Sequence, residues 1–215
     1  MWRGGGLRRR GVAGEGQLGG WRRGDIGWLG IRIANETKSI RAAARASKAT
    51  GAAISFHRSG VGRDEKLQVV STVAEEGADL TRTILGHSDF IAMELPLMKE
   101  LLEMGPYIQF DLLGRLFVPL VYQPAIPART TTGWGVVSIV ADAVVDLINA
   151  GYEDRILLSH DCFPRPNLRS YGGNGWTFIP DKFLPHLRTL GITEDQIHKF
   201  TVENPKRALT FVEPG

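Results

Sequence analysis

The sequence predicts an α/β fold in which short parallel strands alternate with helices. Three observations point to this fold: short apolar runs recur from residue 28 onwards, segments with apolar residues at helical spacing follow them, and these segments end at a glycine. Strands that are joined by helices run parallel, and the helices then cover the sheet. The 215 residues, of which 43% are hydrophobic, suffice for a sizeable core.

The first two strand–helix units occupy residues 28–77. The apolar run Trp28–Ile33 precedes a helix with Asn35 as its expected N-cap and Gly51 at its end. The run Ala52–His57 precedes a helix that ends at Gly77. The apolar stripes predicted for these helices are Ile40, Ala43 and Ala44 in the first, and Leu67, Val70 and Ala74 in the second.

The third and fourth units follow the same pattern. The run Thr83–His87 precedes a helix that begins near Pro96 and ends at Gly105. After the run Tyr107–Asp111, a long loop with several prolines leads to a helix that Gly151 closes. The expected buried residues are Leu97, Met98 and Leu101 in the first of these helices, and Val136, Val140, Val144 and Leu147 in the second.

The fifth run, Arg155–Asp161, is followed by a loop and three helical segments. We expect a helix over Pro180–Leu190, a capping box of Thr193 and Gln196 for the next helix, and Asn204 as the N-cap of the last. Five strands cannot close an eight-stranded barrel of about 250 residues. Either further strands lie outside this sequence, or the sheet is open and doubly wound.

Residues 1–27 form a Gly/Arg-rich segment without a period, which we expect to be disordered, and residues 28–215 form the folded part. A transit peptide and a translated non-coding stretch are alternative origins for this segment. Residues 1–24 hold six arginines and one acid, so the net charge of +3 describes the segment rather than the domain. We therefore do not expect nucleic-acid binding.

The remaining composition points to a cytoplasmic protein without a membrane span. No apolar run approaches the roughly 20 residues that a transmembrane helix needs. The single cysteine, Cys162, cannot form an internal disulfide, which fits a reducing compartment. We expect Cys162 to be a small buried residue rather than a reactive thiol.

Four of the apolar runs end in side chains that can bind metal or transfer protons: His57, His87, Asp111 and Asp161. The carboxyl ends of parallel strands form the ligand side of such folds. A lone histidine at a strand end more often bonds a carbonyl, but two histidines and an aspartate on separate strands favour a divalent ion such as Zn²⁺.

Three other histidines are not expected to be ligands. His160 should point to the side of its strand opposite to Asp161, towards the helices. His186 and His198 lie within helical patterns and are expected to be surface or packing residues.

Several motifs, taken in order, resemble the phosphotriesterase family of the amidohydrolase superfamily over about residues 28–211. They are Ile-Ser-Phe-His, Ile-Leu-Gly-His-Ser-Asp, Ile-Leu-Leu-Ser-His-Asp and the closing Asn-Pro-Lys-Arg-Ala-Leu. The resemblance implies a partial TIM-type (β/α)₈ barrel, consisting of about the last five strand–helix units without the N-terminal strands. It also implies a hydrolase of small esters, lactones or phosphotriesters with two divalent metals, and a homodimer.

The resemblance also implies roles for individual residues. His57 and His87 match the ligands of the more exposed metal, whereas Asp161 matches the catalytic aspartate that binds the buried metal and takes the proton of its hydroxide. Asp111 and Asp89 match positions beside the site. The segments Phe117–Gly133 and Cys162–Thr177 would shape the substrate pocket, with Tyr122, Arg169, Tyr171 and Trp176 as candidate pocket residues.

The sequence departs from the family pattern at two places. It has no His-x-His pair for the buried metal, and the position of the bridging lysine or glutamate holds Ile31 or Arg32, neither of which can bridge metals. His57, His87 and Asp161 could still form a three-ligand zinc site. Two hypotheses follow: a hydrolase whose metal-activated hydroxide attacks the substrate, or a catalytically incompetent fragment of such an enzyme.

Overall fold

The computed structural model describes residues 34–57, 63–115 and 135–215. The Gly/Arg-rich segment 1–27, the expected strand Trp28–Ile33 with both candidate bridging positions, and the loop Phe117–Gly133 with Tyr122 lie outside these ranges. Within them, no helix is long and apolar enough to cross a membrane.

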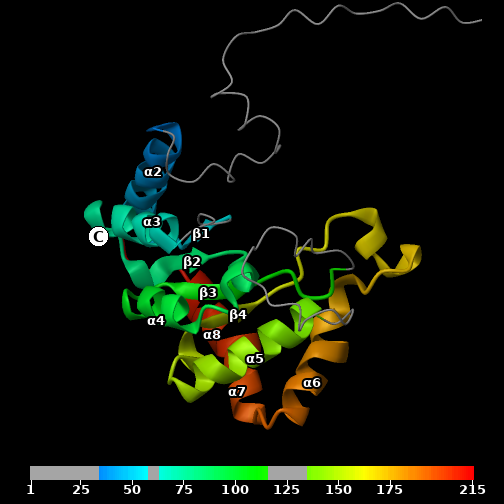
Figure 1. Cartoon of the computed structure of the whole chain (residues 1–215). Coiled ribbons are helices and arrows are strands. Elements are labelled where there is room, and N and C mark those ends of the chain that lie inside the picture. The colour runs from blue at the N-terminus through cyan, green and yellow to red at the C-terminus, as the bar shows by residue number, and fades with distance from the viewer. Residues whose placement is uncertain (1–33, 58–62, 116–134) are drawn as a thin grey trace, which may run out of the picture.

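The described residues form one parallel sheet of four strands in the order β1-β2-β3-β4 (Figure 1). The strands are β1 (Ile54–Phe56), β2 (Thr83–Leu85), β3 (Tyr107–Phe110) and β4 (Ile156–Leu158). Each strand lies inside one of the predicted apolar runs, and neighbouring strands pair in parallel. The predicted α/β class with a parallel sheet is therefore confirmed.

Helices separate the strands along the chain, as the glycine-terminated patterns predicted (Figure 1). Two π-helical turns interrupt the α-helical pattern near the C-terminus. The turn Ile179–Phe183 leads directly into helix α6, and the turn Lys199–Glu203 connects helix α7 to helix α8. The α-helices are α2 (Ala34–Thr50), α3 (Arg63–Glu75), α4 (Leu95–Glu103), α5 (Gly135–Asn149), α6 (Leu184–Thr189), α7 (Glu194–His198) and α8 (Asn204–Leu209).

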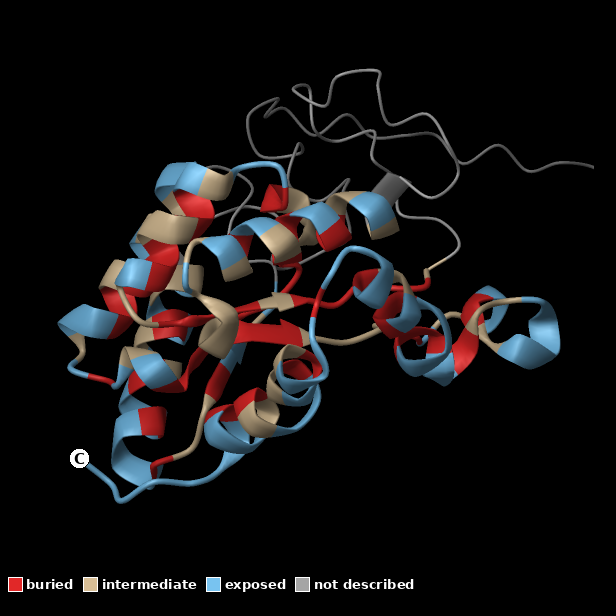
Figure 2. Ribbon diagram, turned by 90° about the horizontal axis from the view of Figure 1, so that it is seen from below, coloured by how far each residue is buried: buried red, intermediate tan, exposed pale blue. Residues whose placement is uncertain are grey.

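Alternate side chains of the strands enter different apolar clusters, because successive side chains in a strand point to opposite faces. Leu85, Ile108 and Ile156 join the main core with residues of α4, α5 and α6. The neighbouring residue of each strand points to the opposite face. These residues, Ile84, Tyr107 and Leu157, form a cluster with Ala208 of α8. Figure 2 shows the strands mostly buried, whereas the exposed residues lie on the outer sides of the helices.

Two sequence predictions for the first helices need correction. In α3, Ala74 is exposed, whereas Val69 and Val73 are buried, so the buried stripe is rotated from the predicted one. The cause is that polar Lys66 and Thr72 also lie on the buried side, which hides the apolar period. Helix α2 already includes Asn35, which is therefore not its N-cap.

Near the C-terminus, the capping box of Thr193 and Gln196 is confirmed, but Asn204 is not an N-cap. The π-helical turn before Asn204 keeps the chain helical, and Asn204 itself has helical angles of φ −65° and ψ −48°. Likewise, the helix expected over Pro180–Leu190 begins with a π-helical turn rather than an α-helical one.

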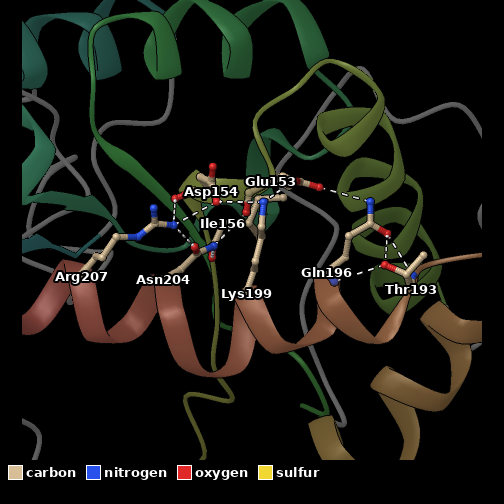
Figure 3. Close-up of polar contacts among 8 residues, drawn as sticks. All are labelled: Glu153, Asp154, Ile156, Thr193, Gln196, Lys199, Asn204 and Arg207. Carbon is tan, nitrogen blue, oxygen red and sulfur yellow. Dashed lines mark hydrogen bonds and ion pairs between the residues drawn. The ribbon is translucent and has the colours of Figure 1, made fainter.

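The buried amide of Asn204 instead holds the start of β4 (Figure 3). Its Nδ2 donates to the carbonyl oxygens of Glu153 and Ile156, both at 2.9 Å. The ammonium group of Lys199 contacts the carboxylates of Glu153 and Asp154. We call Glu153, Asp154, Gln196, Lys199, Asn204 and Arg207 the β4 anchor, since their mutual contacts fix the amino end of this strand.

Candidate metal centre

The carboxyl ends of β1 and β2 bring His57 and His87 together. Their ring centroids are 4.5 Å apart, with an angle of 78° between the ring planes. The pairing of the two strands continues one residue beyond Leu85, because the N–H of Gly86 donates to the carbonyl oxygen of Phe56 at 2.9 Å. A Cβ on Gly86 would lie 2.8 Å from that oxygen, so only glycine allows this approach without a shift.

His87 is buried and fixed by Asp111, which follows the neighbouring strand β3. The Nδ1–H of His87 donates to Oδ1 of Asp111 at 2.5 Å, and the backbone N–H of His87 donates to Oδ2 at 3.1 Å. His87 has left-handed backbone angles of φ 50° and ψ 37°. Since Nδ1 is engaged, Nε2 is the ring nitrogen left to bind a ligand.

Two further polar residues surround Asp111. Nε2 of Gln109 donates to Oδ2 of Asp111 at 2.6 Å, and the carboxylate of Asp89 accepts the backbone N–H groups of Asp111 at 2.9 Å and Leu112 at 3.3 Å. Asp89 thus holds the backbone that carries Asp111. A role for Asp89 beside the site stays a prediction.

The two carboxyl groups have opposite pKa shifts. Burial acts against the charge of Asp111, but the hydrogen bonds from His87 and Gln109 outweigh it and lower the pKa of Asp111 below its usual range. Burial, together with the charge of Asp111, raises the pKa of Asp89 to about 7. Asp111 is therefore the ionised partner that orients the imidazole of His87.

Asp161 lies three residues beyond β4 and has a left-handed φ of 45°. Its Oδ2 accepts a hydrogen bond from Nη1 of Arg115 at 2.8 Å. In residues 34–57, 63–115 and 135–215, no three His, Cys, Asp or Glu side chains are grouped so that they could hold a metal ion. The structure therefore brings His57, His87 and Asp111 together but does not add Asp161 to a three-ligand group.

Of the candidate pocket residues after β4, Arg169 contacts both its own loop and the following π-helical turn. Arg169 pairs with Asp181 and also donates to the carbonyl oxygen of Asn174. The side chains of Tyr171 and Trp176 are exposed, with 65% of Trp176 accessible. Their part in substrate binding stays a prediction.

The residues that were not expected to be ligands have other surroundings. Nε2 of His160 accepts the backbone N–H of Ile179 at 3.0 Å, so this ring faces the helical segment, and burial lowers its pKa. Cys162 is buried, as expected, and its thiol donates to the carbonyl oxygen of Asn167 at 3.6 Å. His186 is half-buried and His198 is exposed.

Sequence reasoning missed three residues of this region: Gly86, Gln109 and Arg115. Gln109 precedes Asp111 by two positions, and the alternation of strand side chains could have placed both on one side. The spacing gave no comparable signal for Arg115, because its contact with Asp161 joins two loops that are 46 residues apart in the sequence.

The imidazoles of His57 and His87 are groups that bind divalent ions, and Asp111 is the carboxylate that orients one of them. Imidazole nitrogens are preferred ligands of Zn²⁺ and of several similar ions. A histidine that binds a metal usually donates its other ring N–H to a carboxylate, as His87 does to Asp111. The two imidazoles therefore supply ligand types that such an ion prefers, and Nδ1 of His87 is already engaged by Asp111.

Comparisons with known proteins identify relatives over most of the chain. The model of the phosphotriesterase family matches residues 25–209. An N-acetyltaurine hydrolase from Dictyostelium discoideum is 30% identical over 192 residues, which cover 88% of this chain and 50% of that protein. A phosphotriesterase-related protein from Nematostella vectensis is 33% identical over 178 residues, which cover 82% of this chain and 48% of that protein.

A solved structure extends the likeness to three dimensions. A resiniferatoxin-binding protein from Rhodobacter sphaeroides is 37% identical with a TM-score of 0.70, and the match covers 82% of this chain and 47% of that one. The chain spans about half the length of the curated relatives it matches. Since the motifs, the parallel sheet and the family model agree, the chain belongs to the phosphotriesterase family.

Proposed function

We propose that residues 28–215 form the C-terminal part of a (β/α)₈ barrel that hydrolyses small carbonyl or phosphoryl compounds with the help of a divalent metal. The observation that carries this proposal is the pair of His57 and His87 at neighbouring strand ends, with His87 oriented by Asp111. Loops at the carboxyl ends of the strands are the usual place of active sites in such barrels.

In this proposal, each residue has a distinct task. His57 and His87 hold the ion, Asp111 orients His87, and Asp161 takes the proton from the attacking water. A bound Zn²⁺ would supply a hydroxide at neutral pH and polarise the substrate oxygen. Since the chain spans half of its relatives, the remaining ligands would come from the part of the barrel that this sequence does not contain.

The relatives suggest the class of substrate. One of them is named as an N-acetyltaurine hydrolase, and another solved structure is described as a lactonase. We therefore propose a small ester, lactone or amide as the substrate, with a phosphotriester as a further member of the class. These compounds share an electrophilic centre that a metal-bound hydroxide can attack.

A second candidate is a catalytically incompetent fragment of such an enzyme. The ion pair between Asp161 and Arg115 favours it, because a carboxylate engaged by a guanidinium is not free to bind metal. His-x-His and the bridging residue are also missing from the sequence. The two candidates differ in whether the purified chain retains metal.

The test is the metal content per chain of the purified protein, compared with His57→Ala and with His198→Ala as a control. His198 is exposed and outside the site. We expect about one metal ion per wild-type chain, a clear loss in His57→Ala and no change in His198→Ala. Metal-free, folded wild-type protein after incubation with Zn²⁺ would overturn the proposal and support the inactive fragment.

A further inference from the structure

The carboxylate of Asp111 is held at both of its oxygens. Oδ1 accepts the Nδ1–H of His87 at 2.5 Å, whereas Oδ2 accepts the backbone N–H of His87 at 3.1 Å and Nε2 of Gln109 at 2.6 Å. A Cβ on Gly86 would lie 3.4 Å from Oδ2, so the backbone that follows β2 also borders this oxygen. Gln109 thus gives Asp111 a hydrogen bond that is independent of His87.

Strand β3 places the side chain of Gln109 on the same side as Asp111. Side chains two positions apart in a strand point to one face, and Gln109 lies opposite Leu157 of β4 in the parallel register. The neighbours Ile108 and Phe110 belong to the main apolar core, so Gln109 is on the other face of the sheet. The half-buried amide therefore reaches Asp111 from a strand, which fixes a side chain more precisely than a loop does.

The chemistry of this contact determines its direction and its effect. An ionised carboxylate only accepts hydrogen bonds, so the amide must present Nε2 to Asp111. A hydrogen bond to a charged group is about twice as strong as one between neutral groups, and the amide adds no charge of its own. Without this bond, the carboxylate could rotate about its Cβ–Cγ bond, and Oδ1 would then leave the ring of His87.

We propose that Gln109 is a positioning residue, which acts on His87 through Asp111. Its amide holds Oδ2, so that Oδ1 stays against Nδ1 of His87 and Nε2 remains the ring nitrogen available to a metal. The inference rests on the proposed metal-binding role of His87 and names a residue that supports it. Removal of the amide donor should weaken both the bond between His87 and Asp111 and the affinity for Zn²⁺.

The experiment uses two substitutions of Gln109 that keep its size. Gln109→Met removes the donor, and Gln109→Glu keeps the shape but replaces the donor by an acceptor. The matched controls are Gln68→Met and Gln68→Glu, because Gln68 is an exposed glutamine of α3. One readout is the Nδ1–H signal of His87 in proton–nitrogen NMR of the metal-free protein, assigned by its loss in His87→Asn. The other is the Zn²⁺ dissociation constant at pH 8, measured by competition with a chelating dye.

We expect the Nδ1–H signal of His87 to move upfield and to exchange faster with water in both Gln109 variants. Partners of metal ligands typically contribute 10–100-fold to affinity, and Gln109 acts one contact further away. Zn²⁺ affinity should therefore fall about 3–10-fold in Gln109→Met. It should fall about tenfold or more in Gln109→Glu, whose carboxylate would face that of Asp111. In an Asp111→Ala background, Gln109→Met should cause no further loss.

The outcomes separate this inference from the proposed function. If the His87 signal and the Zn²⁺ affinity of Gln109→Met and Gln109→Glu matched those of the wild type, the positioning role would be wrong. A loss in Gln109→Met with none in Gln109→Glu would also overturn it, because packing and not the donor would then matter. If the His87 signal moved as expected but the wild type bound no Zn²⁺, the positioning of His87 would stand and the proposed metal-dependent function would fail.

Discussion

Polar side chains gather at both ends of the parallel sheet, but they are paired in opposite ways. In the β4 anchor, at the amino end, the ammonium of Lys199 and the amide of Asn204 face carboxylates and carbonyl oxygens (Figure 3). On the carboxyl side of the sheet, the acids Asp89 and Asp111 lie against each other. Matched charges stabilise a fold, whereas crowded like charges are typical of sites with chemical work to do.

The pKa shifts follow this difference. The hydrogen bond from Lys199 lowers the pKa of Glu153, so the fold favours its charged form. Burial and the charge of Asp111 raise the pKa of Asp89 to about 7, so the fold opposes its charged form. Substitutions at the two ends should therefore have different consequences, one for stability and the other for binding.

The largest effect is expected from Asn204→Ala in the β4 anchor. The change leaves two backbone carbonyl groups without their donor and should lower the free energy of unfolding by about 2–4 kcal/mol. Urea unfolding followed by circular dichroism measures it, with Thr201→Ala, at an exposed position before Asn204, as the control. A loss below about 0.5 kcal/mol, the range of ordinary surface changes, would contradict the anchoring role.

The second largest effect, on metal affinity, is expected from Asp111→Asn on the carboxyl side of the sheet. The asparagine keeps the shape of the side chain but removes the charge that orients His87, so Zn²⁺ affinity should fall about 10–100-fold. Dye competition measures the affinity. Asn204→Ala serves as the cross-control, since its folded fraction should bind metal like the wild type. If Asp111→Asn and Asn204→Ala lost Zn²⁺ affinity equally, the proposed difference in role between the two ends of the sheet would be wrong.

The smallest effect concerns pH. The folded-state pKa of Glu153 is lowered, so its pairing with Lys199 stabilises the fold above the unfolded-state pKa near 4.5 and is lost as the pH falls through the lower folded value. Glu153→Gln should be less stable than the wild type by roughly 0.5–1 kcal/mol at pH 7. The urea midpoints of the wild type and Glu153→Gln should converge as the pH is lowered to 3. A difference between them that stays constant with pH would contradict the prediction.

The sequence allowed the strands and several site residues to be predicted, because both follow from local patterns. Apolar runs that end in His57, His87 and Asp111 indicate strand ends that meet at one edge of a parallel sheet. Two details depend on packing instead. Asn204 before a proline resembles a helix start, and only the π-helical turn before it explains its interior position. The contact of Arg115 with Asp161 depends on how two loops meet.

His87 and Asp161 both have left-handed backbone conformations, which bears on how these positions are expected to evolve. For a residue with a Cβ atom, this conformation costs roughly 1–2 kcal/mol, which glycine does not incur. Glycine at either position would remove this backbone cost, but it would also remove the contact with Asp111 or Arg115. Retention of His87 and Asp161 despite this backbone cost is therefore expected only while their side-chain contacts are under selection.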